Sequence, residues 1–118
     1  MNLSVNIDAV PQKRAGSNKK RKGRYDPPEC KAFKKEFAEL VKKQCDTGIL
    51  TGAIRLKIDI YRDFKTATNQ RYGDIDNLAK GIMDALTGVL WQNDKQITDL
   101  HVTKNLGTPR VNLSIEVI

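Results

Sequence analysis

The sequence is poor in the residues that cross-link small proteins or bind zinc. Its 118 residues include two cysteines and one histidine, and no Cys-x-x-Cys pair occurs, so we expect no zinc site. Cys30 and Cys45 lie fifteen positions apart in a segment with helical periodicity. A rise of ~1.5 Å per residue separates them by roughly 22 Å. A disulfide needs Cα atoms within about 7 Å, so we expect no bond between them.

Long apolar runs are also missing. No stretch approaches the roughly 18 apolar residues of a membrane span, and the first residues lack the charged and apolar regions of a signal peptide. We therefore expect a cytoplasmic protein with no membrane partner. The length suits one domain over residues 1–118, with a modest core and no room for a second one.

Acidic residues are absent from one segment, and this segment carries the whole excess charge of the protein. The chain has 21 Lys and Arg against 14 Asp and Glu, a net charge of +7. The seven basic residues of segment 13–24 are Lys13, Arg14, Lys19, Lys20, Arg21, Lys22 and Arg24. Gly16, Gly23 and Pro27-Pro28 favour an exposed loop here. It could be a solvated loop that aids solubility, but the density of its positive charge favours contact with a polyanion. Nucleic acid is favoured over a membrane surface, because no amphipathic apolar face accompanies the charges.

Apolar and polar residues alternate in three segments, which predicts three half-buried strands. Their apolar positions are Leu3, Val5 and Ile7; Ile54, Leu56, Ile58 and Ile60; and Val111, Leu113, Ile115 and Val117. A fourth strand with weaker alternation runs from about Ile97 to Lys104. The turn residues Asn105 to Pro109 are expected to fold this strand back on the last one as a hairpin.

Two segments have helical periodicity, from about Pro28 to Gln44 and from about Asp76 to Thr87, before Gly88. Their apolar faces hold Cys30, Phe33, Phe37, Leu40 and Val41 in the first, and Leu78, Ile82, Ala85 and Leu86 in the second. Residues 62–73 are polar and predict a loop. The order β-α-β-α-β-β predicts a two-layer α+β domain, with a mixed or antiparallel four-stranded sheet and both helices on one face.

Residues 74–80, DIDNLAK, place two carboxylates at the expected start of the second helix. Asp74 and Asp76 could cap this helix, because a carboxylate accepts from its free amides and suits the positive end of its dipole. One aspartate is enough for a cap. A second carboxylate two positions on repels the first unless a cation lies between them, and Mg²⁺ prefers such oxygen ligands. Lys80 shares a helical face with Asp76 and could pair with a carboxylate or reach a phosphate.

A third acid, Asp94, lies in the polar turn after this helix. Residues 73–97, GDIDNLAKGIMDALTGVLWQNDKQI, resemble the core motif of the RusA family of Holliday-junction resolvases, roughly D-x-D-N-L-x-K-x-x-x-D-A-L followed by an acidic turn. The upstream stretches VPQKRAG and GRYDPPECKAFKKEFAEL are more loosely similar to the family. Asn93 is a departure, because the later turn often has two adjacent acids. The gap before this turn is also a residue shorter than in some members.

The resemblance implies an activity and assigns roles by position. Asp74, Asp76 and Asp94 would bind Mg²⁺, with Mn²⁺ as a possible substitute, and Lys80 would be needed for cleavage. The implied reaction is paired hydrolysis of DNA phosphodiesters at four-way junctions by a homodimer, since two-fold symmetry places two copies of a site. Similar proteins are often carried by phages and prophages, and we expect this protein to be either phage-encoded or associated with the bacterial nucleoid.

Three neighbouring residues have smaller expected roles, and two other functions stay open. Asp84 would pair with Lys80 within the helix. Asn77 could cap the helix or hydrogen-bond near the site, and Trp91 is expected in the core or an interface rather than as a platform for base stacking. The chain could instead be a non-catalytic basic DNA-binding module, or a nuclease for flaps or forks.

Overall fold

The computed structural model describes residues 1–11, 27–63 and 74–118. Its elements are, in chain order, β1 (Asn2–Val5), α1 (Pro28–Gln44), β2 (Ile54–Arg62), α2 (Ile75–Leu86), the 3-10 turn η3 (Asp94–Gln96), β3 (Ile97–Leu106) and β4 (Arg110–Val117). This order confirms the predicted β-α-β-α-β-β arrangement. The predicted basic loop, residues 13–24, lies outside the described residues.

The polar loop predicted over residues 62–73 begins later than expected. Arg62 is the last residue of β2, and its buried guanidinium donates a hydrogen bond to the Asp8 carboxylate at 2.9 Å. A buried charge is tolerated when it is paired in this way. The prediction at Arg62 is therefore wrong, and residues 64–73 lie outside the described part of the chain.

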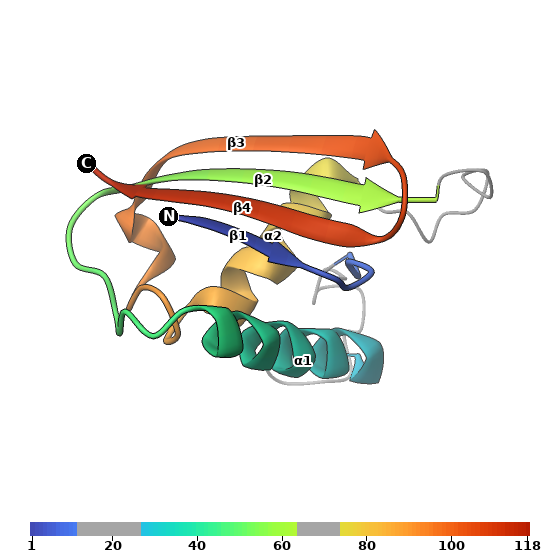
Figure 1. Ribbon diagram of the computed structural model, residues 1–118, viewed down its shortest axis with the longest axis horizontal. Coiled ribbons are helices and arrows are strands. Elements are labelled where there is room, and N and C mark those ends of the chain that lie inside the picture. Colours follow the sequence, from blue (N-terminus) through green and yellow to red (C-terminus); the bar gives the residue numbers. More distant parts are fainter. Residues whose placement is uncertain (12–26, 64–73) are drawn as a thin grey trace, which may run out of the picture.

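The four strands form one mixed sheet in the order β1-β4-β2-β3. β4 runs antiparallel to β1 and to β2, whereas β3 runs parallel to β2 (Figure 1). The predicted hairpin of β3 and β4 is wrong, because β2 lies between these two strands. The turn after β3 instead crosses the end of β2, where the Gly107 N–H donates to the Arg62 carbonyl at 2.9 Å.

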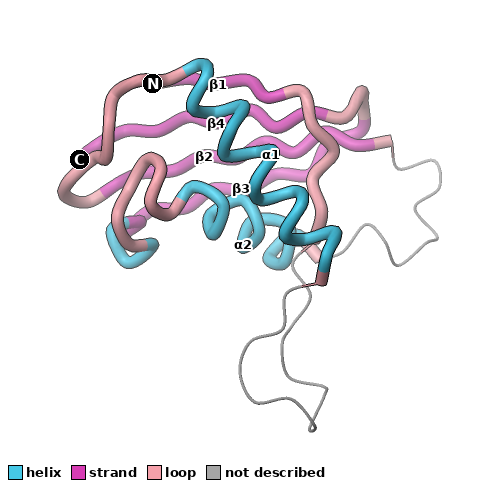
Figure 2. Tube along the Cα trace, turned by 90° about the horizontal axis from the view of Figure 1, so that it is seen from below, coloured by secondary structure: helices cyan, strands magenta, loops and turns pink. Residues whose placement is uncertain are grey.

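Both helices cover the same face of this sheet, as predicted (Figure 2). α1 packs against α2 and β1, and α2 packs against β3 as well as α1. α2 forms part of the crossover that parallel neighbours such as β2 and β3 require. Pro28 opens α1 at the first helical position, where the missing N–H costs nothing. Within the described residues, no helix has the length and apolar content needed to cross a membrane.

One hydrophobic core fills the space between the helices and the sheet. It contains the predicted inward residues of β1, β2, β4 and both helices, except that Cys30 is buried outside this cluster, Leu40 is half-buried and Val117 is exposed. Ile7 belongs to the core but follows the end of β1 at Val5, so the first strand is shorter than predicted. Trp91 is fully buried, and its Nε1 donates to the Thr87 hydroxyl at 3.2 Å. Its predicted place in the core is therefore confirmed. Both cysteines are free thiols, also as predicted.

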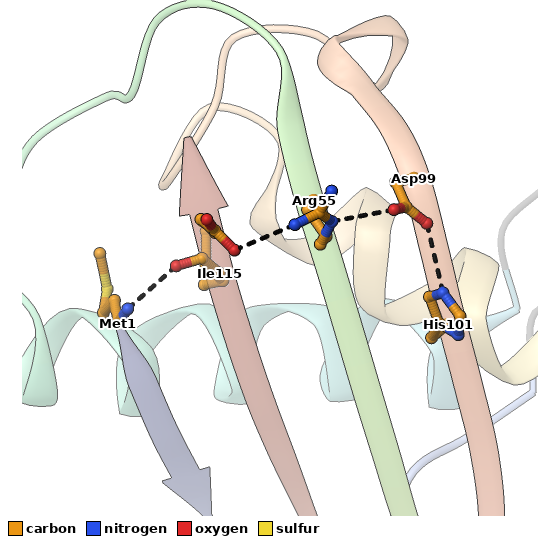
Figure 3. A network of polar contacts seen from close by, with 6 residues as sticks. Met1, Arg55, Asp99, His101 and Ile115 are labelled. Atoms are coloured by element: carbon orange, nitrogen blue, oxygen red, sulfur yellow. Dashed lines mark hydrogen bonds and ion pairs between the residues drawn. The ribbon is translucent and has the colours of Figure 1, made fainter. Parts of the chain in front are cut away.

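The other face of the sheet is polar and carries cross-strand ion pairs (Figure 3). The Arg55 guanidinium on β2 donates to Asp99 on β3 at 2.9 Å and to Glu116 on β4 at 3.4 Å. The Nε2 atom of His101 lies 3.3 Å from the Oδ1 atom of Asp99. The hydrogen bond to Asp99 and the two negative charges raise the pKa of Arg55 above its usual value. Arg55 therefore stays charged throughout the physiological pH range.

Candidate active site

α2 presents two stripes of side chains on different sides. Its core stripe consists of Leu78, Ile82, Ala85 and Leu86. The other stripe repeats at intervals of three and four residues, which places its members on one helical face. These members are Asp76, Ala79, Lys80, Met83 and Asp84. The sequence thus builds a helix with one side in the core and a second side that carries charges.

The charged stripe forms one wall of a pocket of about 410 Å³. Asp94, from η3, and Leu100 and Val102, from β3, complete the lining together with Ile75. This volume lies within the range of small-ligand sites. The fold therefore brings three of the four predicted catalytic residues, Asp76, Lys80 and Asp94, to one concave surface. Three carboxylates and one ammonium line it, a formal excess of two negative charges in a protein of net charge +7.

Asp74, the fourth predicted residue, lies at the N-cap of α2 and does not line this pocket. Its exposed carboxylate makes no capping hydrogen bond to the helix. Asp76 accepts a hydrogen bond from the Asn77 backbone N–H at 2.9 Å. Capping by the Asp74 side chain therefore does not account for an aspartate at this position. The role of Asp74 as a metal ligand stays a prediction.

The charged groups of the pocket differ in their partners. Within residues 1–11, 27–63 and 74–118, no side chain pairs with the Asp94 carboxylate or the Lys80 ammonium. Asp84 instead pairs with Lys34 of α1 at 3.8 Å. The expected pair of Asp84 with Lys80 does not form. A lysine placed N-terminal to an acid is the less favourable order for an i,i+4 pair, and α1 supplies another cation.

The turn that carries Asp94 is held by side chains whose roles the sequence analysis missed. The Asn93 side chain accepts from the Lys95 N–H, and the Gln96 side chain accepts from the Asn93 N–H. This is a capping box, and the Asn-x-x-Gln spacing could have indicated it. Leu100 and Val102 were also missed, because the weak alternation of their strand did not identify an inner face.

The carboxylates present suit a hard cation. In the part of the chain that the structure describes, no three His, Cys, Asp or Glu side chains converge into a ready-made metal site. Mg²⁺ does not need such a cage, because it usually keeps several waters and is held by one or two carboxylates together with substrate phosphates. Asp76 and Asp94, both exposed and lining one pocket, satisfy this requirement.

A two-layer α+β fold with an acidic pocket beside α2 is consistent with a metal-dependent hydrolase, and the comparisons with known proteins define the class as endodeoxyribonucleases, which hydrolyse DNA. The family model described as "Endodeoxyribonuclease RusA" matches residues 6–116. The chain therefore belongs to the RusA family, a type of nuclease that generally depends on a divalent metal. The chain is also similar to "Uncharacterized protein YqaN" of Bacillus subtilis (strain 168). The two are 28% identical over 110 residues, which covers 79% of this chain and 78% of the relative.

Proposed function

We propose that this protein is a Mg²⁺-dependent endonuclease that resolves four-way DNA junctions by paired cleavage. The observation that carries the proposal is the pocket in which Asp76 and Lys80 of α2 meet Asp94 of η3. Asp76 and Lys80 occupy the matching positions of the RusA motif, Asp94 lies in the acidic turn that follows it, and the family model covers residues 6–116. Family membership supports DNA hydrolysis, and the pocket indicates where it would occur.

In this proposal Asp76 and Asp94 hold the metal ion, and Asp74 is a third ligand from the start of α2. A bound Mg²⁺, or Mn²⁺ in its place, would lower the pKa of a bound water and neutralise charge on the scissile phosphate. Both carboxylates are exposed to solvent. They could therefore hold a cation taken up from solvent, and the scissile phosphate would complete its coordination.

Lys80 supplies the positive charge of the pocket. It lies four residues after Asp76 on the same stripe of α2, and its ammonium has no partner among the described residues. We assign it to the negative charge that develops on the phosphate or on the leaving oxygen. A preorganised cation aimed at such charge is worth more in the transition state than in the ground state.

The remaining parts of the proposal concern DNA binding and assembly. The basic residues of segment 13–24 would contact phosphates, which gives affinity without sequence preference.

A homodimer would place one pocket at each of the two symmetry-related cleavage positions of the junction, as paired incision requires. Mixed dimers of wild type with an Asp76→Asn partner should then nick one strand but rarely complete both cuts. The cytoplasmic location and a phage or nucleoid association stay predictions.

One cleavage assay tests the proposal. Purified protein is incubated with a synthetic four-way junction, a flap, a fork and a linear duplex, each with Mg²⁺, with Mn²⁺ and with EDTA. The expected result is paired incision of the junction with either metal and none with EDTA. Preferred cleavage of flaps or forks would change the substrate assignment. Junction binding without cleavage under every metal condition would leave a basic DNA-binding module.

A further inference from the structure

The side chain of Gln96 uses its full hydrogen-bonding capacity at the turn that carries Asp94. Its Oε1 accepts from the N–H groups of Gln92 and Asn93 at 2.9 and 3.1 Å. Its Nε2 donates to the carbonyls of Leu50 and Gly52 at 3.0 and 3.1 Å. An amide side chain has two acceptor sites and two donors. All four are used here, so this side chain has one preferred orientation.

These four bonds join two separate segments of the chain. Leu50 and Gly52 lie in the connection between α1 and β2, more than forty positions before Gln96. A backbone bond from the Leu50 N–H to the Leu90 carbonyl, at 2.7 Å, ties the same connection to the residues that follow α2. The Gln96 amide thus braces η3 against a segment that is itself anchored to the core layer.

A second contact fixes the turn from within. The Asn93 side chain accepts from the Lys95 N–H at 2.9 Å, and the Gln96 N–H donates to the Asn93 carbonyl at 3.0 Å. The backbone on both sides of Asp94 is therefore held by hydrogen bonds. The Asp94 carboxylate itself is exposed and has no partner among the described residues. Its location in the pocket depends on the backbone of the turn.

We propose that Gln96 is a positioning residue that fixes the Asp94 carboxylate for metal binding. The inference rests on the proposed function, because it takes Asp94 as a metal ligand. Residues that orient ligands from behind typically change metal affinity by 10- to 100-fold when they are altered. Gln96 does not line the pocket. Its proposed effect on metal binding is therefore indirect, through the backbone of the turn that carries Asp94.

The test uses Gln96→Glu, which keeps the shape of the side chain. An ionised carboxylate still accepts from the two N–H groups, but it loses both donors and faces the carbonyls of Leu50 and Gly52 with a negative charge. We expect Mg²⁺ binding, measured by calorimetry on the full chain without DNA, to weaken about 10-fold. Hydrogen exchange of the amides of Gln92, Asn93 and Lys95 should become faster.

Gln44→Glu is the matched control. Gln44, at the end of α1, donates from Nε2 to the Ser4 carbonyl at 2.7 Å and does not line the pocket. The same chemical change there should leave Mg²⁺ affinity unaltered.

A second pair of variants is used if Gln96→Glu does not fold. Asn93→Ala removes the hydrogen bond from the Lys95 N–H to the Asn93 side chain, and Asn93→Ser restores an acceptor. The alanine variant should weaken Mg²⁺ binding by roughly threefold, and the serine variant should recover it.

Combination with Asp94→Asn separates positioning from a general effect on the fold. If Gln96 acts through Asp94, adding Gln96→Glu to Asp94→Asn should cause no further loss of Mg²⁺ affinity. Equal losses in both backgrounds would overturn the inference, and so would a loosened turn with unchanged metal binding. Normal cleavage by Asp94→Asn would instead contradict the proposed function, whatever Gln96 does.

Discussion

Acidic residues lie on both sides of the sheet, on its open face and in the pocket on the helix side, but their partners differ. On the open face, Asp99 and Glu116 share the guanidinium of Arg55 at 2.9 and 3.4 Å. In the pocket on the helix side, the Asp94 carboxylate has no partner within the described residues. The residue type is the same on both faces. The difference lies in whether the fold itself supplies a countercharge: among the described residues it does so for Asp99, Glu116 and, in the pocket, Asp84, but not for Asp94.

Strand register explains the pairing on the open face. Arg55 lies opposite Asp99 in the parallel pair and opposite Glu116 in the antiparallel pair. Cross-strand neighbours on one face are close enough to interact directly. The pocket has no such register, because its acids come from a helix and from a turn. An acid there meets a cation only when another element provides one, as Lys34 does for Asp84.

The largest effect should separate Asp94→Asn from Asp99→Asn, the same change on the two faces. Asp94→Asn and Asp76→Asn remove anionic ligands, so Mg²⁺-dependent cleavage should fall about 100-fold or more while the fold is kept. Junction binding without metal should hold or tighten. Asp99→Asn should leave the cleavage rate unchanged. Equal activity of the Asp94 and Asp99 variants would remove Asp94 from the active site.

Lysines allow the second comparison. Lys80→Ala should lower the cleavage rate constant about 100-fold, because a cation aimed at developing charge is lost, yet Mg²⁺ affinity should not fall. Lys57→Ala serves as its control, since Lys57 lies on the open face, where its Nζ is 4.0 Å from the Asp59 carboxylate. Single-turnover cleavage at saturating Mg²⁺ measures both. A Lys80 variant that is slow only because it binds metal weakly would contradict this role.

The basic segment should affect binding rather than chemistry. Neutralising Lys19, Lys20, Arg21 and Lys22 together should weaken junction binding on the order of tenfold. The log-log salt dependence should flatten by up to about four, if all four contact phosphate. The cleavage rate at saturating protein should change little. An unchanged slope in a titration between low and moderate salt would mean that the segment is a solvated loop.

The smallest effect concerns the Lys34–Asp84 pair, which is partly exposed. Lys34→Met and Asp84→Asn should each reduce the free energy of unfolding by up to about 1 kcal/mol, and the double variant should lose about as much as either single one. Chemical denaturation measures these values. Mg²⁺ affinity should rise slightly in Lys34→Met, because the negative charge of Asp84 is then uncompensated. Strictly additive losses would show that the two residues do not interact.

Local patterns in the sequence predicted the helices and strands, and they identified the charged residues that line the candidate pocket. Pro28 and the apolar spacing of α1 predict its bounds, and the alternation in Ile54–Arg62 predicts the inner face of β2. The RusA motif identifies Asp76, Lys80 and Asp94, which the structure brings to one pocket. These features depend on the spacing of residues close together in the sequence, and this spacing can be recognised without knowledge of the fold.

Contacts between segments distant in the sequence could not be predicted from the sequence. The β3–β4 hairpin was expected because consecutive strands usually pair, but β2 occupies the position between them. The partner of Asp84 comes from α1, fifty positions earlier, rather than from its own helix. Gln96 had a visible signal, the spacing to Asn93, yet its bonds to Leu50 and Gly52 depend on a loop brought near only by folding.

The place of β1 at the edge of the sheet has a consequence for how the protein forms during translation. Among the strands of the described residues, β1 pairs with β4 alone, and the Ser4 hydroxyl donates to the Asn112 side chain across a separation of 108 positions. A ribosome that adds ~5–20 residues per second needs roughly 5 to 20 s to synthesise that interval. Until then Leu3 and Val5 have no strand to join, and the nascent chain exposes them. We therefore expect the native sheet to close only after β4 has left the exit tunnel, with the residues of β1 among the last to reach their final place.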